Sequence, residues 1–262
     1  MLHSFFALIQ FMLGVIIGQG AAPGAPPPQG LYTTNFNTLL NGNQDPDWCD
    51  HGPDYGDPNP EPIDPCVRFL SSANTSAFSG SPSYLTVYEL KPSGLLSDDY
   101  HVSYIGSGSQ SWSGYELRAD VRMDAIKSQG LLMHSKMPLS GGHYSFRIYY
   151  AQTNWRLTNE TNAHPVDTCL DTNIFPSAAN IWHHVKMRST VVAGVSVTID
   201  ACIWQDGAGE PAYGAGKMQG TFGCGSCTDA VDKYESGTIG LWTHAVGGAS
   251  GRYFDNITVN DL

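Results

Sequence analysis

Five polar side chains with the chemistry of acid–base catalysis fall on neighbouring stretches of the chain, namely Arg118, His134, Lys136, Arg147 and Tyr149. Cleavage of an acidic polysaccharide by elimination needs a cation or amide that neutralises the substrate carboxylate, and a Tyr or His that moves the proton. In an alternating strand His134 and Lys136 share one face, and so do Arg147 and Tyr149. The pattern predicts a lyase site of His134, Tyr149, Arg118 and Arg147. The alternative is an ordinary solvated sheet face, which strand periodicity alone would create.

A glycoside hydrolase needs two carboxylates that flank the scissile bond, about 5–5.5 Å apart in a retaining enzyme. Glu116 and Asp120 share a strand face. Four residues at about 3.3 Å each separate them by about 13 Å, so they do not form such a pair by themselves. Hydrolysis would need a second carboxylate from another strand.

Sugar binding needs an aromatic ring that stacks on the apolar face of a pyranose, and polar groups that bond its hydroxyls. Trp112 lies in a Ser- and Gly-rich segment and is expected to be exposed, whereas Trp182 alternates like a packing residue. We expect a glycan-binding surface formed by Trp112, Tyr149, Lys136 and Glu116. Binding and catalysis both remain open at this point.

The composition excludes several classes of protein. Of the 262 residues only 14% are charged, against about 25% in an average globular protein, while 29 are Gly and 16 are Pro. These values exclude a coiled coil, a helical repeat array and a charge-driven disordered chain. The net charge of −11 disfavours a nucleic-acid partner, because phosphate binding needs a basic surface.

Strand signals separated by turn residues recur along the chain. In residues 114–123 (GYELRADVRM) the apolar side chains alternate with Glu, Arg and Asp, and no helical period competes. Many such strands predict an all-β fold, a two-sheet antiparallel β-sandwich or jelly roll. The expected strands are 31–40, 84–90, 114–123, 130–136, 143–151, 182–189, 195–204, 237–242 and 252–259.

The N-terminal segment predicts export. Residues 5–17 form an apolar run of thirteen, too short to span a bilayer comfortably and suited to a signal peptide, with an uncleaved membrane anchor as the alternative. We expect a signal peptide over residues 1–20, a Pro-rich linker over 21–30 and one domain over 31–262. The mature protein is then secreted and extracellular, without a membrane span. Two N-x-S/T sequons predict glycosylation at Asn74 and Asn159; a third, at Asn256, lies in an expected strand.

Six cysteines behind a signal peptide predict disulfides, although the sequence does not fix their pairing. Cys49 with Cys66 is the favoured pair, because it would close one Asp- and Pro-rich loop. The C-x-x-C at residues 224–227 indicates a small structural disulfide, with a redox or zinc element as the alternative. The six residues are Cys49, Cys66, Cys169, Cys202, Cys224 and Cys227.

Three motifs carry a resemblance when they are taken in order. The strand at 114–123 is followed by GLLMHSK at 130–136; WHHVKM at 182–187 precedes a strand that runs into Asp206-Gly207; and GTIGLW at 237–242 precedes YFDNITV at 253–259. Over residues 31–262 this order resembles the concanavalin A-like (laminin G-like) jelly rolls. The cysteine pattern and the loop over 42–65 are not general features of that family.

The resemblance implies a range of functions, because such domains serve as lectins, carbohydrate-binding modules, glycoside hydrolases, polysaccharide lyases and adhesion modules. We expect a secreted, lectin-like protein whose partner is a polysaccharide or glycan. The alternatives are a lyase, or less readily a hydrolase, with its site on the concave sheet face, and a laminin G-type adhesion module. The Q-x-H and Y-F-K signatures of alginate-lyase types are absent, and the oligomeric state stays open.

A structural calcium ion (Ca²⁺) is also implied by the resemblance. Asp255 matches an Asp that often coordinates calcium in the family together with main-chain oxygens of the first strand, here near Asn37. Such an ion would tie the two ends of the domain together. The alternative role for Asp255 is a hydrogen bond within a turn.

Overall fold

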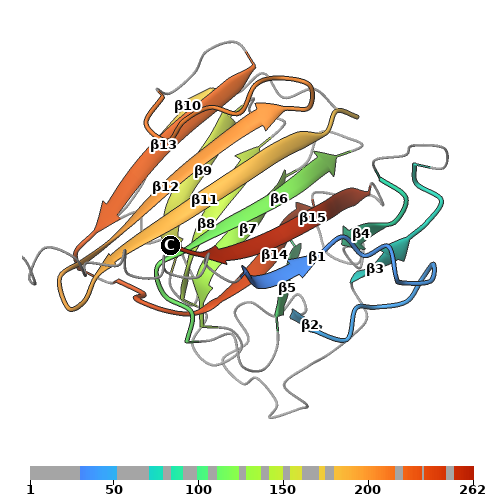
Figure 1. Cartoon of the computed structure of the whole chain (residues 1–262), viewed down its shortest axis with the longest axis horizontal. Coiled ribbons are helices and arrows are strands. Elements are labelled where there is room, and N and C mark those ends of the chain that lie inside the picture. The colour runs from blue at the N-terminus through green and yellow to red at the C-terminus, as the bar shows by residue number, and fades with distance from the viewer. Residues whose placement is uncertain are drawn as a thin grey trace, which may run out of the picture.

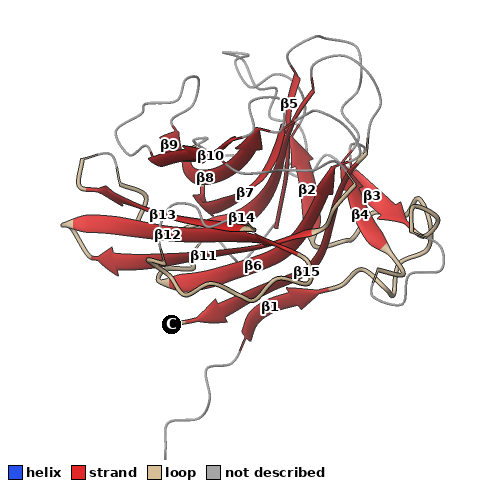
Figure 2. Ribbon diagram, turned by 90° about the horizontal axis from the view of Figure 1, so that it is seen from above, coloured by secondary structure: helices blue, strands red, loops and turns tan. Residues whose placement is uncertain are grey.

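The computed structural model describes residues 30–51, 71–78, 84–90, 99–105, 111–123, 128–136, 142–149, 154–160, 171–174, 180–215, 221–231, 233–245 and 251–262. Their regular structure is β-strand, arranged in two antiparallel sheets (Figures 1 and 2). Within these ranges no helix has the length and hydrophobicity needed to cross a membrane. The expected signal peptide (1–20) lies outside the described residues, as does the expected linker except for Gly30, which begins the first strand.

One sheet has eight strands in the order β13-β12-β11-β6-β15-β4-β3, and β1 also pairs with β15. Both ends of the domain therefore lie in this sheet, because β1 and β15 pair with each other. Its strands are β1 (Gly30–Thr34), β3 (Ser71–Asn74), β4 (Val87–Leu90), β6 (Tyr115–Met123), β11 (His183–Val192), β12 (Ser196–Gln205), β13 (Phe222–Asp229) and β15 (Arg252–Asp261).

The second sheet has seven strands in the order β10-β9-β8-β7-β14-β5-β2. It lies face to face with the eight-stranded sheet (Figure 2). Its strands are β2 (Trp48–His51), β5 (Asp99–Ile105), β7 (Ser128–Ser135), β8 (His143–Tyr149), β9 (Asn154–Glu160), β10 (Asp171–Ile174) and β14 (Thr238–Ala245).

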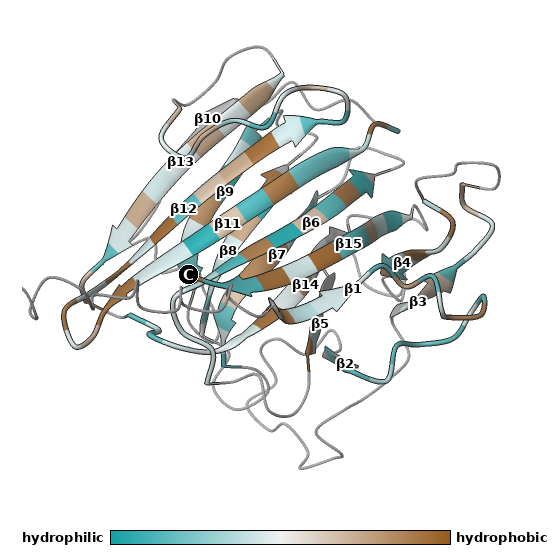
Figure 3. Cartoon of the chain, viewed as in Figure 1, coloured by the Kyte–Doolittle hydropathy of each residue, from teal (hydrophilic) through white to brown (hydrophobic). Residues whose placement is uncertain are grey.

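The alternation of each strand decides which side chains form the core. In β6 the predicted inward residues Leu117 and Val121 are buried in one large apolar cluster with Phe146 of β8 and Ile203 of β12. The same alternation is visible as bands along β6, β11, β12 and β15 (Figure 3). Each large apolar side chain buried here contributes about 1.5–3 kcal/mol. The predicted two-sheet antiparallel sandwich is confirmed.

An irregularity in β7 decides where His134 lies. The pairing of β14 with β7 shifts between Gly240, opposite Leu132, and Thr238, opposite Ser135. His134, within this shift, has a φ of 50°, a conformation that is uncommon outside glycine. The side chain of His134 therefore turns into the interior, next to that of Met133, instead of following the alternation.

Candidate functional site

Three segments far apart in the sequence meet at one end of the sandwich. They are the loop before β6, the end of β7 and the loop before β14. The Gly237 amide donates to the Trp112 carbonyl at 2.9 Å, and Lys136 Nζ donates to Ser236 Oγ at 3.0 Å. Ser113 Oγ donates to the Glu235 carbonyl at 2.7 Å. We call this surface the end cluster: Trp112, Ser113, Lys136, Tyr234, Glu235 and Ser236.

The end cluster is partly open to solvent and chemically mixed. The Trp112 ring is half-buried and meets the buried Tyr115 ring edge-on at 6.1 Å, so the structure makes it less exposed than expected. Lys136 is half-buried, and this burial lowers the pKa of its ammonium. The Glu235 carboxylate accepts from the Gly194 amide at 2.7 Å. An aromatic ring, a cation, a carboxylate and hydroxyls thus share one surface, and these are groups that can bind a sugar.

His134 lies beneath the end cluster and is fully buried. Its Nδ1 faces the Tyr234 carbonyl at 2.5 Å and its Nε2 faces Ser189 Oγ at 3.0 Å, so Nδ1 carries the proton and Ser189 donates. Burial lowers the pKa of the imidazole to about 4. Without access to a substrate, His134 does not move a substrate proton, and this part of the lyase prediction is wrong.

The two predicted lyase arginines lie on opposite sides of the molecule. Arg118 lies on the outer face of the eight-stranded sheet and bonds Glu116 and Glu210. Arg147 lies on β8 of the seven-stranded sheet. Tyr149 ends β8, and its side chain lies outside what the structure describes. The expectation that these residues meet on one face with His134 is therefore wrong.

Arg147 lies on the outer face of the seven-stranded sheet, against an aromatic ring. Its guanidinium carbon lies 4.1 Å from the centre of the Trp242 ring, a cation–π contact. In register Gly130 lies between Arg147 and Trp242, and the missing side chain lets the guanidinium reach across. Arg156 is directly opposite Arg147 on the next strand. Two guanidiniums and an indole therefore share one sheet face.

Glu116, predicted to bind glycan with Trp112 and Lys136, lies on the outer face of the eight-stranded sheet instead of in the end cluster. Its carboxylate accepts from Arg118 Nε at 2.5 Å and from the Tyr213 hydroxyl at 3.0 Å. The predicted glycan-binding set is thus divided: Trp112 and Lys136 both contact the loop before β14, whereas Glu116 lies in an ion-pair network.

Sequence reasoning missed a second polar group on this outer face. His184 Nδ1 lies 2.5 Å from Asp120 Oδ1, and its Nε2 lies 3.2 Å from Asp206 Oδ1. The hydrogen bond to Asp120 raises the pKa of the imidazole, so both ring nitrogens donate in the charged form. Asp120 also accepts from the Tyr84 hydroxyl. Predicting this contact from the sequence would have required the strand register, in which His184 of β11 lies opposite Asp120 of β6.

Asp255, the predicted calcium ligand, lies on the inner strand β15, between the stretch that pairs with β4 and the stretch that pairs with β1. Asp255 is buried, and burial, with Asp120 nearby, raises the pKa of its carboxyl to about 7. The side-chain oxygen of Asn37 accepts from the Thr86 amide at 3.1 Å. Among the described residues no three or more His, Cys, Asp or Glu side chains are grouped to hold a metal. Asp255 fits a cation ligand, and further ligands would have to be main-chain oxygens or water.

The cysteine pairing differs from the expectation for the C-x-x-C. Cys224 bonds Cys202, its direct neighbour across β12 and β13, so the motif does not close on itself. Cys49 and Cys227 are disulfide-bonded as well, with partners outside the described residues, where Cys66 and Cys169 lie. The prediction that Cys49 is bridged is confirmed, and its pairing with Cys66 stays a prediction.

The two sequons have different surroundings. Asn159 is fully buried and its amide donates to the Asp229 carboxylate, so a glycan has no room there and that prediction is wrong. Asn74 is half-buried and its amide donates to Glu89 at 2.7 Å. Glycosylation at Asn74 stays a prediction.

Comparison with known proteins agrees with this architecture. No family model matches the chain, and no curated protein matches it. A protein of unknown function with a galectin-like fold from Bacillus subtilis has 9% sequence identity and a TM-score of 0.50, covering 90% of this chain and 97% of that one. The alginate lyase of Aplysia kurodai, of the class PL-14, has 12% identity and a TM-score of 0.47, covering 74% and 87%. The carbohydrate-binding module CBM66 of Bacillus subtilis has 16% identity and a TM-score of 0.43, covering 66% and 86%. At 9% identity the likeness to the first of these shows the fold alone, a two-sheet sandwich of galectin-like kind.

Proposed function

We propose that the protein binds a carbohydrate and that the end cluster is its binding surface. The observation that carries the proposal is that Trp112 and Lys136, 24 residues apart in the sequence, both contact the loop before β14. The half-buried indole offers an apolar ring for a pyranose, while Lys136, Glu235 and Ser236 offer donors and acceptors for its hydroxyls. Such a surface fits a lectin-like role.

The test is retention of the purified protein on a panel of neutral and acidic polysaccharides, followed by titration with the best ligand. Trp112→Ala and Lys136→Ala are each expected to lower the affinity about tenfold or more. Phe222→Ala is the matched control, because Phe222 is also half-buried but lies far from the end cluster. Phe222 begins β13, whereas Asp229, at the other end of that strand, bonds Tyr144 next to Tyr234 of the end cluster. Unchanged affinity in both end-cluster variants would overturn the proposal.

A second candidate function, an acidic-polysaccharide lyase, is favoured by one observation. The half-buried Arg156 faces the buried Arg147 across β8 and β9, next to the Trp242 ring, so Arg156 is the guanidinium offered to a substrate. Guanidiniums that bind the substrate carboxylate are what elimination needs next to the scissile bond. His134 takes no part in this lyase candidate.

The lyase candidate is tested by the ultraviolet absorbance of unsaturated uronate products. Activity that is lost in Arg156→Met and kept in Arg122→Met, a guanidinium placed over Phe78 on the other sheet, would support it. No absorbance with any uronate polymer would remove the candidate.

We also propose that Asp255 holds a structural calcium ion. Its support is a buried carboxyl with a raised pKa, which a cation would neutralise. Calcium at about 100 times its Kd is expected to stabilise the fold by about 2.7 kcal/mol, measured by urea unfolding with and without a chelator. Asp255→Asn should abolish the calcium effect, whereas Asp261→Asn, an exposed carboxylate on the same strand, should leave it.

Secretion is a further proposal. Its support is the apolar run at residues 5–17 together with disulfide-bonded Cys49, Cys202, Cys224 and Cys227, which need an oxidising compartment. N-terminal sequencing of the protein recovered from culture medium is expected to begin at Ala21. A protein that stays in the cell with Met1 would contradict it.

A further inference from the structure

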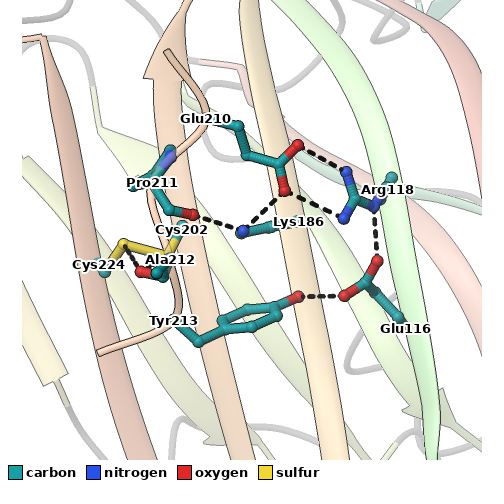
Figure 4. A network of polar contacts seen from close by, with 9 residues as sticks. All are labelled: Glu116, Arg118, Lys186, Cys202, Glu210, Pro211, Ala212, Tyr213 and Cys224. Atoms are coloured by element: carbon teal, nitrogen blue, oxygen red, sulfur yellow. Dashed lines mark hydrogen bonds and ion pairs between the residues drawn. A yellow bond between two sulfur atoms is a disulfide. The ribbon is translucent and has the colours of Figure 1, made fainter. Parts of the chain in front are cut away.

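Residues 206–215, which we call the covering loop, lie over the outer face of the eight-stranded sheet (Figure 4). The Asp206 amide donates to the Trp182 carbonyl at 3.0 Å, which fixes the beginning of the loop. Further along, Lys186 Nζ donates to the Pro211 carbonyl at 2.5 Å, and the Tyr213 hydroxyl donates to Glu116 at 3.0 Å. These contacts place one carboxylate of the loop within hydrogen-bonding distance of Arg118 and Lys186 on the sheet.

That carboxylate belongs to Glu210, and it is held as a bound ligand would be. Arg118 Nη1 and Nη2 each donate to one of its oxygens at 3.0 Å, and Lys186 Nζ donates at 2.8 Å. The paired arrangement is the fork-to-carboxylate geometry that arginine favours for planar anions. Lys186 is only 4% exposed, so its ammonium forms a built part of the site and not a mobile surface charge.

Aromatic rings flank this carboxylate site. Lys186 Nζ lies 4.5 Å from the centre of the Tyr213 ring and 5.8 Å from that of Trp204. The guanidinium carbon of Arg188 lies 4.3 Å from the same Tyr213 ring. A carboxylate site next to aromatic rings matches a sugar that carries a carboxylate, because the rings can pack against its apolar face.

The Glu210 side chain is replaceable without unfolding the sheet beneath it. It is 41% exposed, and an ion pair at such a position contributes little because water and salt screen it. Gly207 and Gly214 bracket it with φ values of 82° and 77°, where glycine is the residue best able to change conformation. Arg118 and Lys186 lower the pKa of Glu210 to about 2, so near neutral pH it leaves by competition with another anion and not by protonation.

We propose that Arg118 and Lys186 form a second ligand site, which Glu210 fills in the free protein and which the carboxylate of a uronic-acid residue in an acidic glycan occupies in its place. The ligand ring then lies near Tyr213. Because Glu210 competes with the ligand, the free protein masks its own site and binds weakly. This site is on a different surface from the end cluster and does not depend on the function proposed there.

The experiment compares Glu210→Gln with wild type in calorimetric titrations with galacturonate, polygalacturonate, neutral galactan and inorganic sulfate. Removing the competing charge is expected to raise the affinity for both uronates about tenfold and to leave galactan unchanged. Asp261→Asn removes one exposed carboxylate elsewhere and is the control for net charge; it should stay within about twofold of wild type. Arg118→Met added to Glu210→Gln should remove the gain.

Three results would overturn the proposal. They are an affinity in Glu210→Gln equal to that in Asp261→Asn, an equal gain for galactan or inorganic sulfate, and a gain that survives Arg118→Met. A uronate gain that also persists in Trp112→Ala would support this site even if the end cluster binds nothing. The urea unfolding curve of each variant confirms that it is folded.

Discussion

Two histidines, one between the sheets and one on the outer face of the eight-stranded sheet, differ in which protonation state their surroundings favour. Between the sheets His134 faces a carbonyl and a hydroxyl, and burial lowers its pKa to about 4. On the outer face His184 faces Asp120 and Asp206, and hydrogen bonding to Asp120 raises its pKa. The surroundings therefore hold the imidazole neutral in one region and favour its charged form in the other.

The partners supplied by the fold explain the difference. The interior offers dipoles such as the Tyr234 carbonyl and the Ser189 hydroxyl, which satisfy a neutral ring. Even the buried Asp229 is bonded there by dipoles, since it accepts from Tyr144, Asn159 and the Val231 amide. The outer face offers charges from neighbouring strands and from the covering loop, within reach of water. A histidine that is to carry charge is therefore better served on this outer face than at the position of His134.

The largest expected effect is the acid sensitivity of His134. Its folded pKa of about 4 lies below the ordinary 6.5, so the unfolded chain takes up the proton first as the pH falls. The stabilisation is complete above pH 6.5 and falls by about 3 kcal/mol toward pH 4. Urea unfolding of wild type and His134→Asn measures it, because Asn tolerates the φ of 50°. A pH-independent difference between the two proteins would contradict the neutral interior.

The next effect concerns the outer face, where the Cys202–Cys224 disulfide joins two strands under the covering loop. It closes a sequence separation of 22 residues, and its loss in the Cys202→Ser, Cys224→Ser double variant should cost about 3 kcal/mol. The loss should be the same in acid and at neutral pH, unlike that of His134. A loss below about 1 kcal/mol would show that this face gains little from the crosslink.

A matched pair of hydroxyls sharpens the comparison. Ser189→Ala removes a buried hydroxyl that serves His134 and the Tyr115 amide, and it should cost about 2 kcal/mol because both are left without it. Thr198→Val removes a hydroxyl paired with Thr228 on the outer face, at 2.9 Å, and should cost less than about 0.5 kcal/mol. Equal costs, measured by urea unfolding, would mean that the two regions do not differ.

The fold followed from the sequence where apolar and polar residues alternate. All of the expected strands were found, and for β6, β11, β12 and β15 the observed bounds differ from the expected ones by no more than three residues. Two of the missed strands, β13 and β2, lack such alternation, whereas β9 (Asn154–Glu160) shows it at Trp155 and Leu157 and was missed all the same. In β13 (Phe222–Asp229) Gly, Cys and Ser replace large apolar side chains, and β2 (Trp48–His51) lies within the stretch expected to be a loop.

The candidate site was predicted only in part. Trp112 and Lys136 both contact the loop before β14. The residues of the lyase set do not come together, because one shifted residue in β7 turns His134 inward, and spacing alone does not predict such a shift. Arg118 and Glu210 lie 92 residues apart, and no local pattern encodes their pairing. Alternation specifies which face a side chain takes; loop contacts decide what it meets there.

The smallest expected effect belongs to His184 and has the opposite sign to that of His134. Its folded pKa lies above 6.5, so its stabilisation is complete below pH 6.5 and is lost as the pH rises through the folded value. The pair with Asp206 is partly exposed, which limits the loss to about 0.5–1 kcal/mol. In urea unfolding, His184→Gln should remove this alkaline decline, and Asp206→Asn should remove only part of it because Asp120 remains. If the alkaline decline in the free energy of unfolding is unchanged in His184→Gln, another group causes it. His184 is then not a charged histidine that stabilises the outer face.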